Sequence, residues 1–481
     1  MLSRRALNGL AEIASGSRVL TAREDLLTYA GDATPLQRQL PAAVVLPRDA
    51  EEVARIVRLA NEEGFALVPR GAGSGLSGGA TPIPDSVVLL FPTWSRIVEI
   101  DEANLTAWVE PGVVTGQLHA AVEAVGLFYP PDPGSMKVCT IGGNVAENAG
   151  GLRGLKYGST QNYVQGLDVV LPTGEAVRLG GKAIKDVAGY NLVDLMVGSE
   201  GTLGVFTRIL LRLVPKPETV RTMLALYDSV EAAGESVAAI IAGKIVPATL
   251  ELLDRATIRA VEAFAGLGLP TDLGALLLIE VDGRRHEVEQ DAFEIVRLCR
   301  LHGARDVRLA ASPEEADDLR AARRIAFSAL ARGGPTVILE DATVPRSAVP
   351  DMLRRIHAAA DRHGVTIATF GHAGDGNLHP TCLTDERDAD ALARAEAAFE
   401  EIFAAAIALG GTITGEHGVG LAKRRFLPAQ VGDPAIRLMR QIKAVLDPNQ
   451  VLNPGKIFEP GPRCEHPPIG HRVYERAGRA G

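Results

Sequence analysis

The feature that most limits the fold of this chain is a glycine-rich loop, residues 71–79, that no helix can directly follow. Gly73 to Gly78 match the pattern G-x-G-x-x-G. In a Rossmann unit a helix begins directly after this pattern, and its N-terminus binds a pyrophosphate. Here Pro82 and Pro84 stand just after the loop, where their missing amides and fixed φ rule out that helix. We therefore reject a Rossmann unit. The loop is either an anion nest built from successive backbone amides or a flexible connection.

Two further stretches are as rich in small residues as this loop. They are PPDPGSMKVCTIGGNVAENAGG, residues 130–151, and VGSEGTLGVFT, residues 197–207. Small residues leave backbone donors accessible and let a large flat ligand lie against the main chain. Three such stretches between residues 71 and 207 indicate an extended ligand that contacts the chain along its length.

Length and charge restrict the class of protein. The 481 residues exceed what one hydrophobic core usually covers, so two or more domains are expected. Hydrophobic residues make up 46% and charged residues 23% of the chain, as in a typical globular protein. The 50 basic and 59 acidic residues give a net charge of −9. With no run of Lys or Arg, this balance argues against a nucleic-acid partner.

The cysteines and the start of the chain favour a reducing compartment. The four cysteines form no CxxC pair, which argues against a disulfide framework and a cysteine-bound iron–sulfur cluster in this chain. The first residues lack the apolar segment of a signal peptide. No run of about 18 apolar residues occurs that would form a transmembrane segment. We expect a cytoplasmic protein, with peripheral attachment at the inner face of the membrane left open.

Hydrophobic periodicity divides the chain into three parts. Residues 1–216 contain mainly predicted strands, among them a hairpin that turns at Pro172–Gly174, and this part ends between Pro215 and Pro217. Residues 217–430 alternate apolar strands with helices and predict an α+β domain. Residues 431–481 predict a helix followed by an extended tail. In the second part we expect helices at 230–243, 255–265, 286–302, 314–331, 347–363 and 388–409.

Two histidine-containing motifs suggest a metal site. His372 and His379 flank the turn-forming residues of GHAGDGNLHP, and Glu416 lies in TGEHGVG. Two imidazoles and a carboxylate suit a divalent cation such as Zn²⁺ or Mn²⁺ with open positions. The spacing alone fits equally well two turns with surface histidines. Asp375 and Asn377 are expected to be turn residues and not ligands.

Several of these motifs resemble a known flavoprotein superfamily. PRGAGSGLSGGA, PPDPGSMKVCTIGGNVAENAGG, KYG and VGSEGTLGV resemble the FAD domain of the vanillyl-alcohol oxidase (PCMH) superfamily. GHAGDGNLHP, TGEHGVG and LNPGKIF resemble the C-terminal half of its FAD-linked 2-hydroxy-acid dehydrogenases. The resemblance extends from about residue 20 to 460 and is strongest to the catalytic FAD subunits of bacterial glycolate oxidases. D-lactate and D-2-hydroxyglutarate dehydrogenases are relatives.

The resemblance implies a fold, a cofactor and its contacts. The fold is α+β: a PCMH-type FAD-binding domain of two α/β subdomains, plus an α+β C-terminal substrate domain. The FAD is non-covalent, because the loop has Ser74 and no His or Cys where some members attach the flavin. The implied FAD contacts are Arg70, Gly71, Ala72, Gly73, Ser74, Gly75 and Leu76 at the pyrophosphate, Pro133, Gly134, Ser135, Gly142, Gly143, Asn144 and Asn148 beside the flavin, Glu200, Gly201 and Gly204 near the adenosine or ring, and Asn453.

The implied reaction gives roles to the remaining residues. Oxidising a 2-hydroxy acid removes the hydroxyl proton and passes the C2 hydride to flavin N5. A metal held by His372, His379 and Glu416 would stabilise the developing alkoxide. His417 is the candidate base, unless it is only structural. The family pattern RKxAF gives Arg323 the substrate carboxylate. Otherwise the arginines of this helix form a solvated face.

The sequence therefore predicts an FAD- and metal-dependent dehydrogenase of a small 2-hydroxy acid, glycolate or D-lactate. The alternatives are a D-2-hydroxyglutarate dehydrogenase, for which Phe327 and Leu339 offer no second cation, and a non-catalytic flavin-binding subunit. The resemblance implies as partners a second flavin-domain subunit and an iron–sulfur subunit. The tail with Cys464, His466 and His471 is expected to be disordered or partner-binding, and not a metal site. The exact substrate, the metal, the electron acceptor and the oligomeric state stay open.

Overall fold

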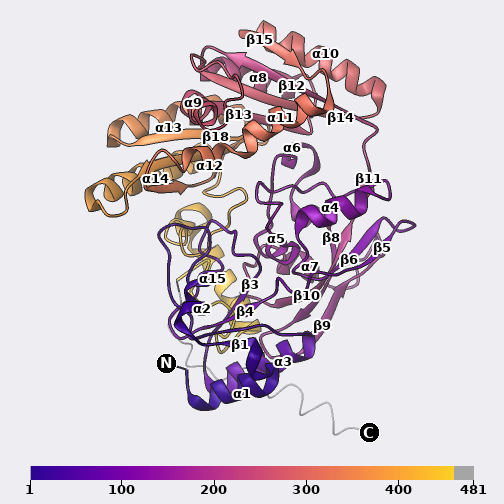
Figure 1. The fold of residues 1–481 in the computed structure, drawn as a ribbon, viewed down its shortest axis with the longest axis vertical. Helices are drawn as coiled ribbons and strands as arrows, with labels where there is room; N and C mark the ends of the chain where they lie inside the picture. The colour runs from indigo at the N-terminus through magenta and orange to yellow at the C-terminus, as the bar shows by residue number, and fades with distance from the viewer. Residues whose placement is uncertain (1, 460–481) are drawn as a thin grey trace.

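The computed structural model describes residues 2–459, and the expectation for the tail with Cys464 lies outside them. The described chain forms two bodies (Figure 1). The N-terminal body holds residues 2–217 and the end of the chain, and the C-terminal body holds the elements from residue 219 to 409. Helices and sheets occur in both, so the α+β prediction is confirmed.

A small, largely parallel sheet positions the glycine-rich loop. Its order is β1-β2-β4-β3, with β1 (Val19–Leu20), β2 (Ala43–Val45), β3 (Leu67–Arg70) and β4 (Val87–Leu90). Around it lie α1 (Arg4–Ala14), α2 (Arg23–Leu27) and α3 (Ala50–Glu63), which is capped by the Asp49 carboxylate. Because β2 and β3 both run parallel to β4, the loop leaves β3 at the carboxyl edge of the sheet, where open sheets place ligands.

An antiparallel sheet forms the rest of the N-terminal body. Its order is β5-β6-β10-β8-β9, with β5 (Ile97–Asp101), β6 (Thr106–Val109), β8 (Val164–Val170), β9 (Ala176–Gly180) and β10 (Val205–Arg212). The predicted hairpin is β8–β9, and Gly174 in its turn has φ 82°. The remaining elements are β7 (Leu127–Phe128) paired with β11 (Val214–Pro215), and the helices α4 (Thr115–Glu123), α5 (Ile141–Glu147), α6 (Gly154–Tyr157) and α7 (Leu192–Met196).

The C-terminal body is built on one eight-stranded antiparallel sheet. Seven strands follow the order β15-β12-β14-β13-β18-β19-β16, and β17 also pairs with β19. The strands are β12 (Thr219–Tyr227), β13 (Thr249–Asp254), β14 (Ala275–Gly283), β15 (Ala304–Leu309), β16 (Thr336–Leu339), β17 (Ala342–Thr343), β18 (Thr366–His372) and β19 (Asn377–Thr384).

Helices cover both faces of this sheet. One face packs against α8 (Val230–Ala242), α10 (Arg285–Leu301), α13 (Val349–His363) and α14 (Ala389–Ala408), and the other packs against α9 (Arg255–Ala265), α11 (Pro313–Arg324) and α12 (Ala326–Leu330). The expected helices are present. The stretch predicted as one helix, 314–331, is two, because Ile325 takes φ −85° and ψ −3° between them.

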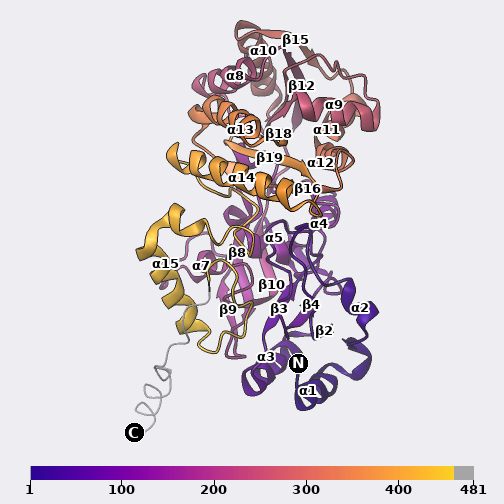
Figure 2. The ribbon, with the colours of Figure 1, turned by 90° about the vertical axis from the view of Figure 1, so that its left-hand side faces the viewer.

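The end of the chain returns to the glycine-rich loop. After the C-terminal body, α15 (Leu427–Leu446) lies against the N-terminal body, in yellow in Figure 2. The Leu67 amide then donates to the Val451 carbonyl at 2.7 Å, alongside β3. The Asn453 side-chain amide donates to the carbonyls of Gly79, at 2.9 Å, and Glu200, at 2.8 Å. The Lys456 ammonium donates to the Gly78 carbonyl at 2.5 Å and shares the Gly79 carbonyl at 3.2 Å. The last segment thus holds the loop from the side opposite its free amides.

Asn453→Ala should destabilise the protein by about 3 kcal/mol in chemical unfolding. It loses two hydrogen bonds worth about 1 kcal/mol each, and alanine at φ 44° adds about 1 kcal/mol. Asn449→Ala is the matched control, because exposed Asn449 bonds only Asn61 and should lose less than about 0.5 kcal/mol. Equal unfolding free energies for the two variants would contradict this account of the C-terminal segment.

Candidate active site

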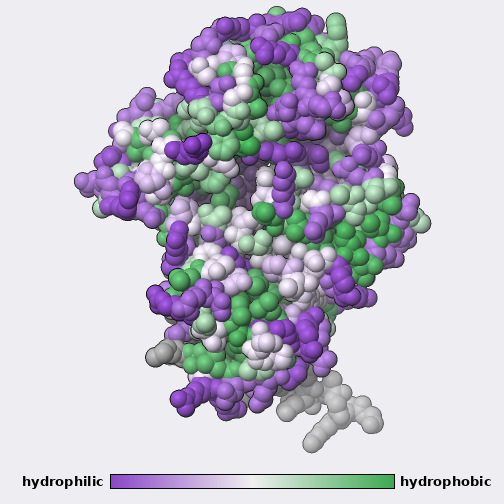
Figure 3. Space-filling view, viewed as in Figure 1, coloured by the Kyte–Doolittle hydropathy of each residue, from purple (hydrophilic) through white to green (hydrophobic). Residues whose placement is uncertain are grey.

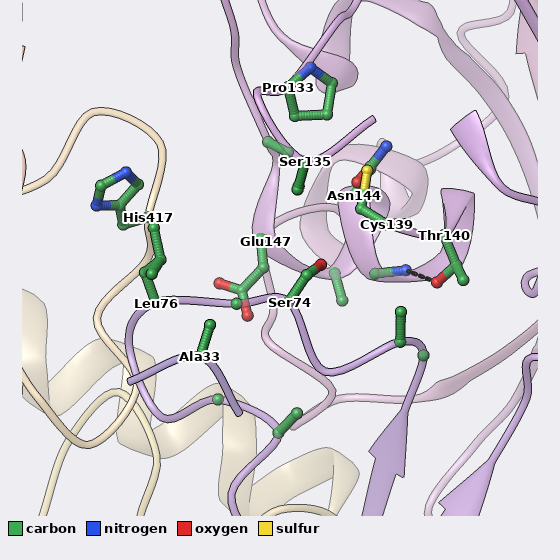
Figure 4. A pocket seen from close by; sticks show the side chains of 18 of the residues that line it. Ala33, Ser74, Leu76, Pro133, Ser135, Cys139, Thr140, Asn144, Glu147 and His417 are labelled. Carbon is green, nitrogen blue, oxygen red and sulfur yellow. Dashed lines mark hydrogen bonds between the residues drawn. The ribbon is translucent and has the colours of Figure 1, made fainter. Parts of the chain in front are cut away.

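A cavity of about 450 Å³ lies between the two bodies. One wall comes from the glycine-rich loop and from residues 133–152 and 200–206, and the other comes from α11, α12, β18, β19 and residues 416–417. Figure 4 shows the loop bearing His417 opposite Ser74 and Leu76. On the face drawn in Figure 3, a hollow separates the two bodies.

The glycine-rich loop presents free amides to this cavity. Within residues 2–459, no backbone amide from Gly71 to Gly79 donates to a protein acceptor. Arg70 lies beneath the loop, and its Nη1 donates to the Gly31 carbonyl at 2.7 Å. A Cβ on Gly73 would lie 2.1 Å from the Arg70 guanidinium, and glycine also suits its φ of 71°. Successive unpaired amides of this kind form an anion nest.

Most of the residues expected at the cofactor line the cavity. They are Arg70, Gly71, Ala72, Gly73, Ser74, Gly75, Leu76, Pro133, Gly134, Ser135, Gly142, Gly143, Asn144, Glu200, Gly201 and Gly204. The small size of several has a packing reason: a Cβ on Gly71 would lie 2.2 Å from Thr140 Oγ1, and one on Gly142 would lie 2.6 Å from Pro111 Cβ. The loop therefore packs directly on the 130–151 stretch.

Two of the expected residues are not part of the cavity lining. Asn148 ends α5 in the left-handed region, at φ 56°, and its side-chain oxygen accepts from Ser159 and Gln161. Asn453 lies behind the loop and bonds its carbonyls. For both, direct cofactor contact stays a prediction, and the hydrogen bonds in the structure show that each also holds neighbouring segments of the chain. Asparagine suits these places because it tolerates positive φ.

His372, His379 and Glu416 converge in the structure. The hairpin β18–β19 pairs His372 with Asn377 and Phe370 with His379, so both imidazoles lie on the cavity side. The Nε2 atoms of His372 and His379 lie 3.0 and 3.3 Å from Glu416 Oε1. All three candidate ligand atoms lie within 4.8 Å of one another. Both histidines are buried, so the alternative of surface histidines in two turns is wrong.

The pKa values of the three residues in the cluster shift in different directions. Burial lowers the pKa of His379 to about 4, so its imidazole is neutral. Burial also disfavours the charged form of His372, but Glu251 and Glu416 outweigh it and raise the pKa of His372. Despite its own burial, Glu416 has a lowered pKa because both histidines stabilise its carboxylate. The cluster is therefore an ionised carboxylate between two imidazoles, a donor set that suits a divalent cation.

Asp341 shapes the loop that bears Glu416 and His417. One oxygen of its fully buried carboxylate accepts the amides of Gly415 at 2.7 Å, Glu416 at 2.8 Å and His417 at 3.2 Å. Its other oxygen accepts the Lys423 ammonium. A carboxylate with several N–H donors at this position fixes the backbone of the loop. Asp341 was not predicted from the sequence, because its hydrogen-bond partners, from Thr414 to Lys423, are 73 to 82 residues away.

His417 lies beside the cluster and contacts it face to face. Its ring stacks on the His379 ring at 5.1 Å between centroids and 8° between planes. Its Nδ1 lies 3.4 Å from Asp341 Oδ1, and its Nε2 lies 3.9 Å from Glu416 Oε1. One edge of the imidazole thus faces a carboxylate, and the ring borders the cavity.

Arg323 is buried and lines the cavity, so it does not belong to a solvated helix face. Its guanidinium lies 4.6 Å over the Phe370 ring, and its Nε donates to Glu251. Arg320 instead bonds Glu280 at 2.6 Å and is not part of the lining, whereas Arg324 lines the cavity. The sequence analysis also missed Glu251. A carboxylate between the apolar residues of the strand TLELLD signals a buried partner, but nothing in the sequence identifies that partner.

Family models match most of the chain. A model described as "FAD binding domain" matches residues 41–180, and one described as "FAD linked oxidases, C-terminal domain" matches residues 216–457. The chain belongs to the FAD-linked oxidases. This oxidase is 54% identical to glycolate oxidase subunit GlcD of Bacillus subtilis (strain 168), over 89% of its own length and 91% of that protein.

Other relatives of this FAD-linked oxidase match over similar lengths. It is 40% identical to GlcD of Escherichia coli (strain K12), over 93% of this chain and 89% of that one. It is 37% identical to a D-lactate dehydrogenase of Anaerostipes hadrus, over 86% and 88%. Its fold matches p-cresol methylhydroxylase with a TM-score of 0.78 at 18% identity, covering 94% and 96% of the two chains. This confirms the predicted PCMH-type architecture.

The cavity fits FAD on grounds of its own. The free amides of 71–79 suit a pyrophosphate, and the crowded glycines leave the backbone open to a flat ring. Glu147 Oε2 is buried without a hydrogen-bond partner among residues 2–459, and Glu147 lines the cavity. Burial raises the pKa of Glu147, which favours the protonated carboxyl, the form that donates a hydrogen bond. The sequence analysis missed this residue. No helix within residues 2–459 is long and apolar enough to cross a membrane.

Asp341→Asn should lower the unfolding free energy by about 3–5 kcal/mol, because it removes one partner of a buried ion pair. The amide also brings an N–H toward either Lys423 or the loop amides. Asp385→Asn is the control: Asp385 pairs with the exposed Arg387 and should lose less than about 1 kcal/mol. Similar urea midpoints for the two variants would contradict the claim that Asp341 holds residues 415–417.

Proposed function

We propose that this FAD-linked oxidase oxidises a small 2-hydroxy acid, glycolate or D-lactate, to the 2-oxo acid, with a bound divalent metal, Zn²⁺ or Mn²⁺. One observation carries the proposal: the amide nest, the His/His/Glu cluster and a buried arginine border the same cavity. The names of the relatives, glycolate oxidase subunits and a D-lactate dehydrogenase, support this substrate class.

The two bodies would bind different ligands. Residues 1–216 would bind FAD, residues 217–430 would bind substrate and metal, and residues 431–481 would return to hold the FAD loop. The FAD would be non-covalent, since the loop 70–76 has Ser74 and no His or Cys. When bound, FAD supplies a hydride acceptor, flavin N5, for the C2 hydrogen.

His372, His379 and Glu416 would hold the metal. A divalent ion there supplies a Lewis acid for the substrate hydroxyl. With three protein ligands, such a site keeps a position open for substrate, as catalytic metal sites do and closed structural sites do not. The neutral form of His379, caused by its burial, is the form that ligates a metal.

Arg323 would bind the substrate carboxylate. Glu251 occupies its Nε, while within residues 2–459 no protein hydrogen bond engages its Nη1 and Nη2. These two terminal nitrogens present a fork that matches a carboxylate. Phe370 supports the guanidinium plane. The substrate would therefore be held by its carboxylate at Arg323 and by its hydroxyl at the cluster.

His417 would act as the base. Its Nε2 would accept the hydroxyl proton as C2 loses its hydride. The resulting imidazolium would be stabilised by Asp341, whose carboxylate lies 3.4 Å from Nδ1.

Turnover requires a second redox partner. We propose a non-nicotinamide acceptor, reached through a second flavin-domain subunit and an iron–sulfur subunit, because two relatives are named as subunits of glycolate oxidase. We place the protein in the cytoplasm, with peripheral contact at the inner face of the membrane as the alternative.

One observation favours a second substrate. Phe327 and Leu339 line the cavity and offer no charge, but Arg324 also lines it and is a cation one residue from Arg323. A distal carboxylate, as in D-2-hydroxyglutarate, would need such a cation. The substrate test therefore includes this dicarboxylate.

Anaerobic bleaching of the bound flavin should identify the substrate. We expect glycolate or D-lactate to bleach it in a single turnover at least roughly tenfold faster than D-2-hydroxyglutarate, since one missing charge-assisted contact costs about 1.5 kcal/mol or more. L-lactate is the stereochemical control. Bleaching by the dicarboxylate alone would replace our substrate with the alternative, and bleaching by none would refute the proposed class.

Arg323 and His417 should be separable by kinetics. Arg323→Ala should raise KM by roughly 10- to 100-fold, because it removes a charge-assisted contact made before and during reaction. His417→Ala should lower the flavin reduction rate by roughly 10²- to 10⁴-fold with little change in KM. The matched controls are Arg320→Ala on the same helix and His363→Ala on α13. Wild-type flavin reduction in His417→Ala would exclude it as the base, and unchanged KM in Arg323→Ala would exclude that anchor.

A further inference from the structure

One buried carboxylate serves both halves of the candidate site. Glu251 lies in β13, next to β18, and is fully buried. Its Oε1 lies 2.5 Å from His372 Nδ1, and its Oε2 accepts the Nε–H of Arg323. Glu251 itself is absent from the cavity lining, so it acts only through these two side chains.

The contact with His372 sets the tautomer of that imidazole. A carboxylate 2.5 Å from Nδ1 places the ring proton on Nδ1. Nε2, which lies 3.0 Å from Glu416 Oε1, is then the ring atom left to bind a cation beside Glu416. A carboxylate behind a ligating histidine fixes the ring and makes it a stronger donor.

The contact with Arg323 sets the direction of its guanidinium. With Nε held by Glu251 and the plane resting on Phe370, the guanidinium has little freedom to rotate, and within residues 2–459 its terminal nitrogens have no hydrogen-bond partner. The same charge that orients the metal ligand therefore orients the carboxylate anchor. Neither partner alone bonds both oxygens of Glu251, because each contacts a different one.

We propose that Glu251 is the positioning residue that couples metal binding to substrate-carboxylate binding. This inference rests on the proposed function, since it assigns both ligands to the same cavity. It predicts that one substitution, at a residue that touches neither ligand, weakens both. Glutamine is the informative change, because both partners are N–H donors and an amide has only one acceptor oxygen.

Glu280 provides a matched control on the neighbouring strand. It is also buried in the same sheet, and it bonds Arg320 at 2.6 Å and Thr222 at 2.6 Å. None of these three residues lines the cavity. Glu280→Gln therefore disturbs an equivalent buried pair without touching His372 or Arg323.

The first measurement is metal affinity without substrate, by chelator competition with Zn²⁺ and Mn²⁺ on the FAD-loaded protein. Glu251→Gln should bind the metal roughly 10- to 100-fold more weakly, while Glu280→Gln binds it as the wild type does. FAD content and thermal midpoints of both variants report folding. If the Glu251→Gln variant does not retain FAD, the same measurement is made on the Glu251→Asp variant. Aspartate keeps two acceptors but withdraws them by one methylene, and should show a smaller loss of the same kind.

The second measurement is KM, which should rise roughly tenfold or more in Glu251→Gln and stay unchanged in Glu280→Gln. In the Arg323→Ala background, adding Glu251→Gln should raise KM no further, because Glu251 acts through Arg323. The coupling would be overturned if Glu251→Gln weakened the binding of the metal alone or of the substrate alone. It would also be overturned if Glu280→Gln weakened both as much as Glu251→Gln does. A wild-type protein that binds no metal or oxidises no 2-hydroxy acid would instead refute the proposed function.

Discussion

The site depends on carboxylates that are buried and fully paired. A charge removed from water costs several kcal/mol unless donors surround it. Asp341 meets three amides and Lys423, and Glu251 meets His372 and Arg323. Because these donors belong to the groups that border the cavity, satisfying each carboxylate also fixes a part of the site. The cost of desolvating these two carboxylates thus keeps the loop and the side chains that bond them in fixed positions.

The two bodies contribute different kinds of rigidity. In the N-terminal body, the free amides of the glycine-rich loop are held open by contacts to its carbonyls from Asn453 and Lys456. In the C-terminal body, the hairpin β18–β19 places two imidazoles on one side of a broad sheet. Glu200 joins the two, since its carboxylate accepts the amides of Val419 and Gly420 at 2.8 and 2.7 Å. A molecule bound at the glycine-rich loop and an ion bound at the His/His/Glu cluster would therefore occupy the same cavity.

Much of this was predictable from local patterns. Pro82 and Pro84 excluded a Rossmann helix, and the loop indeed returns directly to β4. The α+β class followed from the alternation of strand and helix patterns after residue 217. The convergence of His372, His379 and Glu416 followed from two imidazoles and a carboxylate in turn-rich motifs, once the resemblance was added.

The rest was not predictable, because it depends on contacts between distant residues. Glu251 is 121 residues from His372, and a carboxylate between apolar strand residues indicates a buried partner but does not identify it. Asn148 was expected at the cofactor from the resemblance alone, and its left-handed backbone at the end of α5, with φ 56°, was not expected. Composition and spacing do not distinguish Arg323 from Arg320, and only the resemblance to the pattern RKxAF selected Arg323. Only the packing of α11 directs one to the cavity and the other to Glu280.

Metal reconstitution tests the central claim most directly, namely that the His/His/Glu cluster and the FAD loop form one catalytic site. The FAD-loaded protein is stripped with a chelator, and Zn²⁺ or Mn²⁺ is returned in steps while bound metal and anaerobic flavin bleaching are both recorded. Our account predicts that the stripped protein keeps its FAD, that bleaching recovers in proportion to bound metal up to one ion per chain, and that His372→Ala recovers none. A metal-free protein that keeps its FAD and bleaches it at the full rate would contradict the account.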